Sequence, residues 1–159
     1  MINDDLQYYY SGDGTAAGSL GGAIHANAVA NSQDQNVFDN IGTAEALASS
    51  EKYRCLYIKN TGAVSYTFGL YISTTTPSTD TLIQFGIGTA AVNTAEQSII
   101  NEDTEPSGVF WVARTQEFNP LSIATLAPGD TKSIWIKRIV SADSGGNDAD
   151  YFILSAVEV

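Results

Sequence analysis

From residue 53 onward the chain alternates its side-chain types with a period of two, and this pattern constrains the fold most. The clearest examples are YRCLYIKN (53–60), SYTFGLYIS (65–73) and KSIWIKRIV (132–140). Successive side chains of a β-strand point to opposite faces of a sheet, so this period predicts strands. Gly, Pro, Asn and Asp separate the segments, and SGVFWVAR (107–114) and LSIATL (121–126) extend the series. We therefore predict an all-β fold, an antiparallel β-sandwich of Ig-like or jelly-roll type.

The first 50 residues differ in composition from the rest. They are rich in Gly, Ala, Ser, Asn and Asp, as in SGDGTAAGSLGGAIHANAVANSQDQ, and apolar side chains are sparse. Closely spaced glycines interrupt any regular pattern. We predict an extended N-terminal arm over residues 1–50 and a β-sandwich domain over residues 51–159. A short helix is compatible with TAEALASSEKY (43–53), with Thr43 as its N-cap.

Composition excludes several classes of protein. The chain has 159 residues and a net charge of −11, with 18 acidic and seven basic residues. Nucleic-acid binding needs a basic face, so we expect no nucleic-acid partner. No apolar run reaches the ~20 residues of a membrane helix, and the acidic start is unlike a signal peptide. We expect no membrane partner and synthesis in the cytoplasm.

No catalytic motif stands out, and we expect no enzymatic activity. Cys55, the one cysteine, lies in an apolar segment and is interpreted as a small buried hydrophobe. The acidic stretch NEDTEP (101–106) is interpreted as a solvated loop. Asp143, Asp148 and Asp150 supply oxygen ligands in DSGGNDAD, but their spacing differs from a calcium loop. We therefore expect no cofactor, with calcium at this loop as the weaker alternative.

The segment SIWIKR raises a question, because an acidic protein gathers cations beside a tryptophan. Alternation places Ile134 and Ile136 on one face of the expected strand and Trp135 and Lys137 on the other. Trp135 and Lys137 are therefore candidates for contact with another chain, where aromatic residues and Arg are enriched. Arg138, also a candidate, lies at the end of the strand or pairs with an acid inside. A sugar-binding platform at Trp135 is one alternative, and a face covered by the chain itself is the other.

Tyr8, Tyr9 and Tyr10 are the remaining interface candidates. They fall in the expected arm, where we anticipate no local core to receive their rings. An arm of this kind is costly to order alone and gains contacts when it crosses neighbouring subunits.

Four stretches together resemble a known group of proteins: SLGGAI, YRCLYIKNTG, GIGTAAVNTAEQSIINEDTEPSGVFW and LAPGDTKSIWIKRIVSA. They are similar to small virion structural proteins of tailed bacteriophages, over about residues 19 to 159. The resemblance implies assembly on a particle, most plausibly as a capsid decoration (cement) protein, and it implies no catalytic residues. The expected partners are other virion proteins, chiefly the major capsid protein, and further copies of the chain. The expected location is the virion, and a neck or tail position or a carbohydrate-binding role in host attachment is the alternative.

Overall fold

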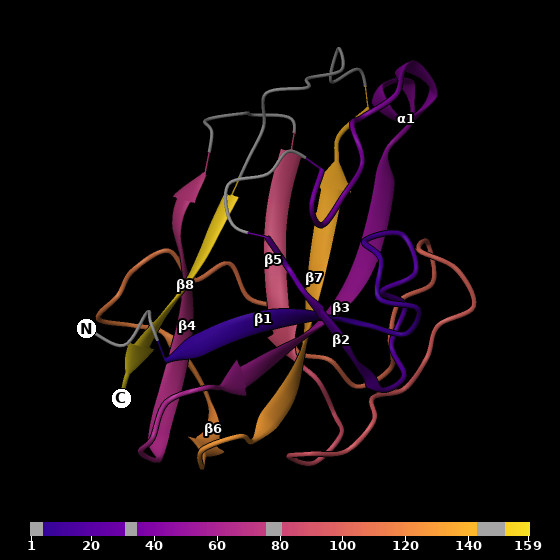
Figure 1. The fold of residues 1–159 in the computed structure, drawn as a ribbon. Coiled ribbons are helices and arrows are strands. Elements are labelled where there is room, and N and C mark those ends of the chain that lie inside the picture. Colours follow the sequence, from indigo (N-terminus) through magenta and orange to yellow (C-terminus); the bar gives the residue numbers. More distant parts are fainter. Residues whose placement is uncertain (1–4, 31–34, 76–80, 143–151) are drawn as a thin grey trace.

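The computed structural model describes residues 5–30, 35–75, 81–142 and 152–159 (Figure 1). Its elements, in chain order, are β1 (Leu6–Ser11), β2 (Ile24–Ala28), α1 (Thr43–Leu47), β3 (Ser50–Asn60), β4 (Tyr66–Thr75), β5 (Thr81–Ile87), β6 (Leu121–Leu126), β7 (Thr131–Val140) and β8 (Phe152–Glu158).

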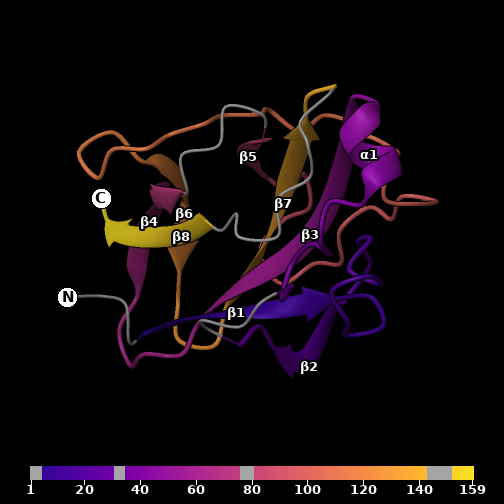
Figure 2. The ribbon, with the colours of Figure 1, turned by 90° about the horizontal axis from the view of Figure 1, so that it is seen from above.

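The strands form two sheets, and every pair of neighbouring strands is antiparallel. One sheet has the order β2-β1-β3-β7-β5, and the other has the order β6-β4-β8. Seen from above, β4, β6 and β8 form a group on one side of β3 and β7 (Figure 2). The predicted all-β architecture with antiparallel sheets is therefore confirmed, and the arrangement is sandwich-like.

The main core lies between the two sheets. The side of the five-stranded sheet that faces β4 is here called the interior face, and the opposite side is the outer face. Apolar side chains of both sheets meet at the interior face, where burial of each stabilises the fold by about 1.5–3 kcal/mol. The buried members from strands are Leu56, Ile58, Leu70, Ile72, Phe85, Ile134 and Ile136.

Strands β3 and β7 form the centre of the five-stranded sheet. They pair in continuous register from Ser50 opposite Val140 to Lys59 opposite Thr131. Because the register is unbroken, the alternation of each strand places matching residues on each face. Ile134 and Ile136 lie at the interior face as predicted, and Trp135 lies at the outer face between them.

The N-terminal segment is not a separate arm in the residues that the structure describes. β1 pairs with β3 over five residues, from Leu6 opposite Asn60 to Tyr10 opposite Leu56. β2 then returns along the other edge of β1. The expected boundary at residue 50 is therefore not a boundary of the fold, because β1 joins the first 50 residues to the main sheet.

The helix is shorter than the segment compatible with it. α1 ends at Leu47, because the chain from Ser50 onward pairs with β7. Gly42, not Thr43, is the N-cap, and no side chain caps the helix. Within the described residues, no helix is long and apolar enough to cross a membrane.

Two connections position the rest of the molecule. Pro128 and Gly129 make the predicted turn between β6 and β7, with Gly129 at a φ of +87° and Asp130 N donating to Ala127 O. This turn carries the chain from one sheet to the other. The second connection is the long irregular stretch from β5 to β6. The strand predicted over 107–114 is absent there, because only Val112 pairs, in a single bridge to Phe85.

Candidate functional site

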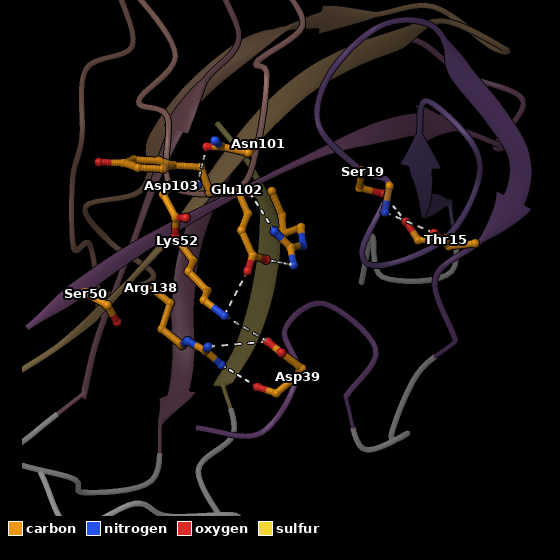
Figure 3. A network of polar contacts seen from close by, with 12 residues as sticks. Thr15, Ser19, Asp39, Ser50, Lys52, Asn101, Glu102, Asp103 and Arg138 are labelled. Atoms are coloured by element: carbon orange, nitrogen blue, oxygen red, sulfur yellow. Dashed lines mark hydrogen bonds and ion pairs between the residues drawn. The ribbon is translucent and has the colours of Figure 1, made fainter. Parts of the chain in front are cut away.

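Lys52 of β3 and Arg138 of β7 belong to one network of ion pairs (Figure 3). Arg138 lies 2.8 Å from Glu45 of α1 and 3.5 Å from Asp39. Lys52, opposite Arg138 in the register, lies 2.9 Å from Glu102 and 3.6 Å from Glu45 and from Asp39. The network therefore ties the α1 segment and the stretch around Glu102 to the central strands.

A second guanidinium completes this network. Arg54 pairs with Glu102 and is almost fully buried. Phe38 lies beside both arginines, with its ring centroid 5.4 Å from the guanidinium of Arg54 and 4.9 Å from that of Arg138. Cation–π attraction adds to the ion pairs when the groups are removed from water. Arg138 is thus paired with acids inside the chain, which answers the question that its position in the sequence left open.

Lys137 lies on the outer face and is also buried. Its Nζ lies 2.9 Å from Glu51 and over the rings of Tyr53 (5.6 Å) and Trp111 (5.9 Å). Trp111 in turn donates its indole N–H to Glu105 at 2.8 Å. The expectation that Lys137 is open to another chain is therefore wrong, because its own chain surrounds it.

The expectation of an outward Trp135 is also wrong. Its side chain is 0 % exposed and packs with Tyr53, Cys55, Tyr57 and Ile99. Leu20, Val109 and Trp111 cover this cluster from outside. Trp135 therefore cannot stack on a sugar or anchor a partner from this position, and the alternative of a face covered by the chain itself is the one observed.

The three consecutive tyrosines also pack within their own chain. Tyr8 and Tyr10 pack against the main core, and Tyr9 packs at the outer face. Tyr8 donates to Leu154 O at 3.3 Å and Tyr10 to Asn36 O at 2.7 Å. Burial raises the pKa of Tyr8 and of Tyr10. The expected lack of a local core around Tyr8, Tyr9 and Tyr10 is wrong, because β1 lies in the main sheet.

A buried carboxylate organises the stretch after β5. Glu96 accepts hydrogen bonds from Ser133 Oγ (2.5 Å), Thr89 Oγ1 (2.9 Å), and the backbone N–H groups of Ala90 (3.0 Å) and Gln97 (3.1 Å). Burial raises the pKa of Glu96, but these hydrogen bonds outweigh it and leave the pKa below its ordinary value. Glu96 is therefore held as a carboxylate.

At Lys132, in contrast to Glu96, burial has the larger effect on the pKa. Its Nζ donates to Gly88 O at 2.9 Å and to Ala90 O. Burial lowers the pKa of Lys132, and the charge of Glu96 partly compensates. Lys132 therefore binds the backbone at residues 88–90, next to the groups that bind Glu96, and is buried.

Few cations reach the surface that results, and none is more than half-exposed. All seven Lys and Arg residues lie in the described ranges: Arg54, Lys132, Lys137 and Arg138 are buried, and Lys52, Lys59 and Arg114 are half-buried. Among the acids that the structure describes, only Asp39, Glu45, Glu51 and Glu102 form salt bridges with Lys or Arg, so the described surface is acidic. The sequence shows the excess of acids, but it does not show that most of the cations are buried.

Large apolar side chains are exposed on this acidic surface, and sequence reasoning missed them. The most exposed are Ile100 (87 %), Phe118 (84 %) and Phe110 (75 %). Alternation in 107–114 predicted a strand there, and no sequence signal marked Phe110 as exposed. Exposed apolar groups that gather on one surface commonly mark contact with another molecule.

The remaining candidates from the sequence are Cys55 and the possible calcium ligands. Cys55 is fully buried, as interpreted, and burial raises the pKa of its thiol. No group of three or more His, Cys, Asp or Glu side chains able to hold a metal occurs among the described residues. Asp143, Asp148 and Asp150, the calcium alternative, lie outside the described residues.

Comparison with known proteins gives no further assignment: no family model, no curated protein and no solved structure matches the chain.

Proposed function

We propose that this chain is a non-enzymatic virion structural protein of a tailed bacteriophage, a decoration (cement) protein that binds the capsid. The observation that carries the proposal is the exposure of the large apolar side chains of Ile100 and Phe110 on an acidic surface where most cations are buried. Such groups lower the free energy of a complex by leaving water, while the acidic charge keeps free copies apart. The resemblance to phage virion proteins supplies the kind of assembly.

The fold suits this role. We assign the two sheets to a β-sandwich of Ig-like or jelly-roll type, supported by the apolar cluster that joins them and by the β6–β7 turn that links the sheets. The proposed partner is the major capsid protein, the proposed location is the virion, and several copies occupy each particle. Because β1 lies within the main sheet, we assign particle binding to the surface of the folded domain and no longer to an arm.

The test is binding to capsids of the encoding phage from which this protein is missing. Purified protein is mixed with the capsids and sedimented, and an acidic β-protein of similar size serves as the control. We expect saturable cosedimentation and density for the protein on the capsid faces by electron microscopy. Binding at the neck or tail would refute a decoration role and keep the virion role; no binding to any part of the particle would refute both.

A further inference from the structure

A long irregular segment covers part of the outer face of the five-stranded sheet, next to Leu20 of the β1–β2 connection. Residues 96–112, here called the loop layer, are fixed at both ends by backbone bridges, from Glu96 to Gly22 and from Val112 to Phe85. Between these ends, Tyr53 N donates to Glu102 O at 2.8 Å. The loop layer is therefore tied to the β1–β2 connection, to β3 and to β5.

Two stretches of the loop layer run alongside each other. They begin together, because Gln97 and Ser107 exchange two hydrogen bonds, from Ser107 N to Gln97 Oε1 and from Gln97 Nε2 to Ser107 O. They also end at the same place. Tyr53 bonds Glu102 through its backbone, and its ring lies 5.5 Å from the ring of Trp111. The stretches 97–102 and 107–111 are therefore neighbours on the surface.

Each stretch buries one apolar residue and exposes the next. Ile99 and Val109 pack into the cluster around Trp135, and Ile100 and Phe110 directly follow them on the solvent side. Because the inward residues are fixed in a core, the outward residues are held in place before any partner binds. A partner then loses little entropy in ordering them, which favours affinity.

The charge of the loop layer defines the partner. Asp103 and Glu105 are exposed within it, whereas Glu96 is buried and Glu102 is paired with Lys52 and Arg54. No Lys or Arg occurs between residues 60 and 113. Contact between two loop layers would therefore bring exposed acids together with no Lys or Arg from either layer, and elsewhere in the chain only Lys52, Lys59 and Arg114 are half-buried rather than buried. Complementarity therefore favours a basic partner.

We propose that the loop layer is the docking surface, with Ile100 and Phe110 entering an apolar recess rimmed by Lys and Arg on a protein other than this chain. The inference rests on the proposed function, and there the partner is a basic, outward-facing part of the capsid protein. Aromatic anchors at the centre of an interface contribute most of the binding free energy, and charges at the rim mainly set specificity and association rate.

The test compares Phe110→Ser and Ile100→Ser with Phe118→Ser in capsid cosedimentation. Phe118 is a matched control, because it is equally exposed but lies in the turn of Gln116–Asn119, outside the loop layer. We expect each loop-layer variant to raise the dissociation constant at least tenfold and Phe118→Ser to leave it within twofold. Melting temperatures within a few degrees of the wild type exclude misfolding as the cause.

Charge is tested separately. Asp103→Asn should weaken binding severalfold, and wild-type binding should weaken as NaCl rises from 50 to 300 mM. If the wild type binds capsids but Phe110→Ser and Ile100→Ser bind equally well, the loop layer is not the docking surface and the decoration role stands. Binding that strengthens with salt, or loss of self-association in Phe110→Ser, would overturn the basic partner. If the wild type does not bind, the proposed function fails and this inference with it.

Discussion

Replacement of Trp135 separates a buried core residue from a contact residue. The side chain is fully buried and packs with Tyr53, Cys55, Tyr57 and Ile99. Truncation of a buried Trp to Ala costs about 3–5 kcal/mol through lost burial and the cavity that remains. A domain of this size has a free energy of unfolding of about 5–15 kcal/mol. Trp135→Ala therefore removes a large share of the stability.

Trp135→Phe gives a second, sharper expectation. The indole N–H of Trp135 is buried and has no hydrogen-bond partner among the described residues. An unpaired buried donor costs about 1–3 kcal/mol, and phenylalanine removes that donor while keeping most of the ring. The loss of apolar contact and the removal of the unpaired group oppose each other. We therefore expect Trp135→Phe to change the free energy of unfolding by less than about 1.5 kcal/mol.

Thermal unfolding followed by circular dichroism measures both variants. A change of 1 kcal/mol shifts the melting temperature by about 2–4 °C in a chain of this length, so Trp135→Ala should lower it by about 6–20 °C. Phe118→Ala, at an exposed position, should leave it almost unchanged. Iodide should not quench Trp135 fluorescence in a Trp111→Phe background. A Trp135→Ala melting temperature equal to that of the wild type, with free quenching, would refute the covered outer face.

Three further changes probe the parts that hold the loop layer in place. Glu96→Gln should lower the free energy of unfolding at pH 7 by about 1.5–3 kcal/mol, because the carboxylate accepts four hydrogen bonds, and urea titration measures it. Burial raises the pKa values of Glu96 and Glu102. Hydrogen bonds outweigh burial at Glu96, and hydrogen bonds and ion pairs with Lys52 and Arg54 outweigh it at Glu102, so both pKa values lie below the ordinary 4.5. The stability that these two carboxylates contribute is therefore complete above pH 4.5 and is lost as the pH falls through their lower pKa values in the folded protein. Glu96→Gln should make the free energy of unfolding depend less on pH in this acidic range, and an unchanged pH dependence would contradict the assignment of Glu96 as a buried carboxylate. Gly86→Ala should cost about 1–3 kcal/mol and displace the loop layer, because its Cβ would meet Phe110 O at 2.7 Å; unaltered stability and capsid binding would contradict the close packing. Arg138→Met should cost about 1.5–3 kcal/mol, because Glu45 and Asp39 then keep only the longer ion pair with Lys52 at 3.6 Å, and the loss should persist in 0.5 M NaCl; a neutral result would mean that this ion pair adds no net stability.

The strands could be predicted where alternation is regular, and the faces only in part. In β3 and β7 the period of two correctly sorted Ile134 and Ile136 from Trp135. Alternation shows which residues share a face, but it does not show whether another part of the chain covers that face. Trp135 is covered by Leu20 and Val109, which lie far from it in the sequence. Such contacts depend on the path of loops, for which the sequence carries no period.

The N-terminal strands and the loop layer were missed for a related reason. The alternation of β1 is hidden, because the consecutive residues Tyr8, Tyr9 and Tyr10 place the same kind of side chain on both faces. The partner strand of β1, β3, also lies almost fifty residues away in the sequence. Tertiary pairing thus decides the structure of a segment whose composition favours irregular chain. In the loop layer, Val109 packs partly buried against the outer face, where the segment lies close to Gly86, and Phe110 next to it is exposed.

The positions of the cations in the sequence can be explained once their contacts on both faces of the five-stranded sheet are known. On the interior face, Arg138 pairs with Glu45 of α1, and Arg54 pairs with Glu102; on the outer face, Lys137 lies over the rings of Tyr53 and Trp111. Removing a charge from water is costly unless it is paired, so each buried cation requires nearby acids of the same chain. Exposed acids such as Asp103 and Glu105 then have few cations near them at the surface. Internal pairing therefore produces the acidic surface around Ile100 and Phe110, and the same ion pairs that fix the loop layer also determine which partner charge it attracts.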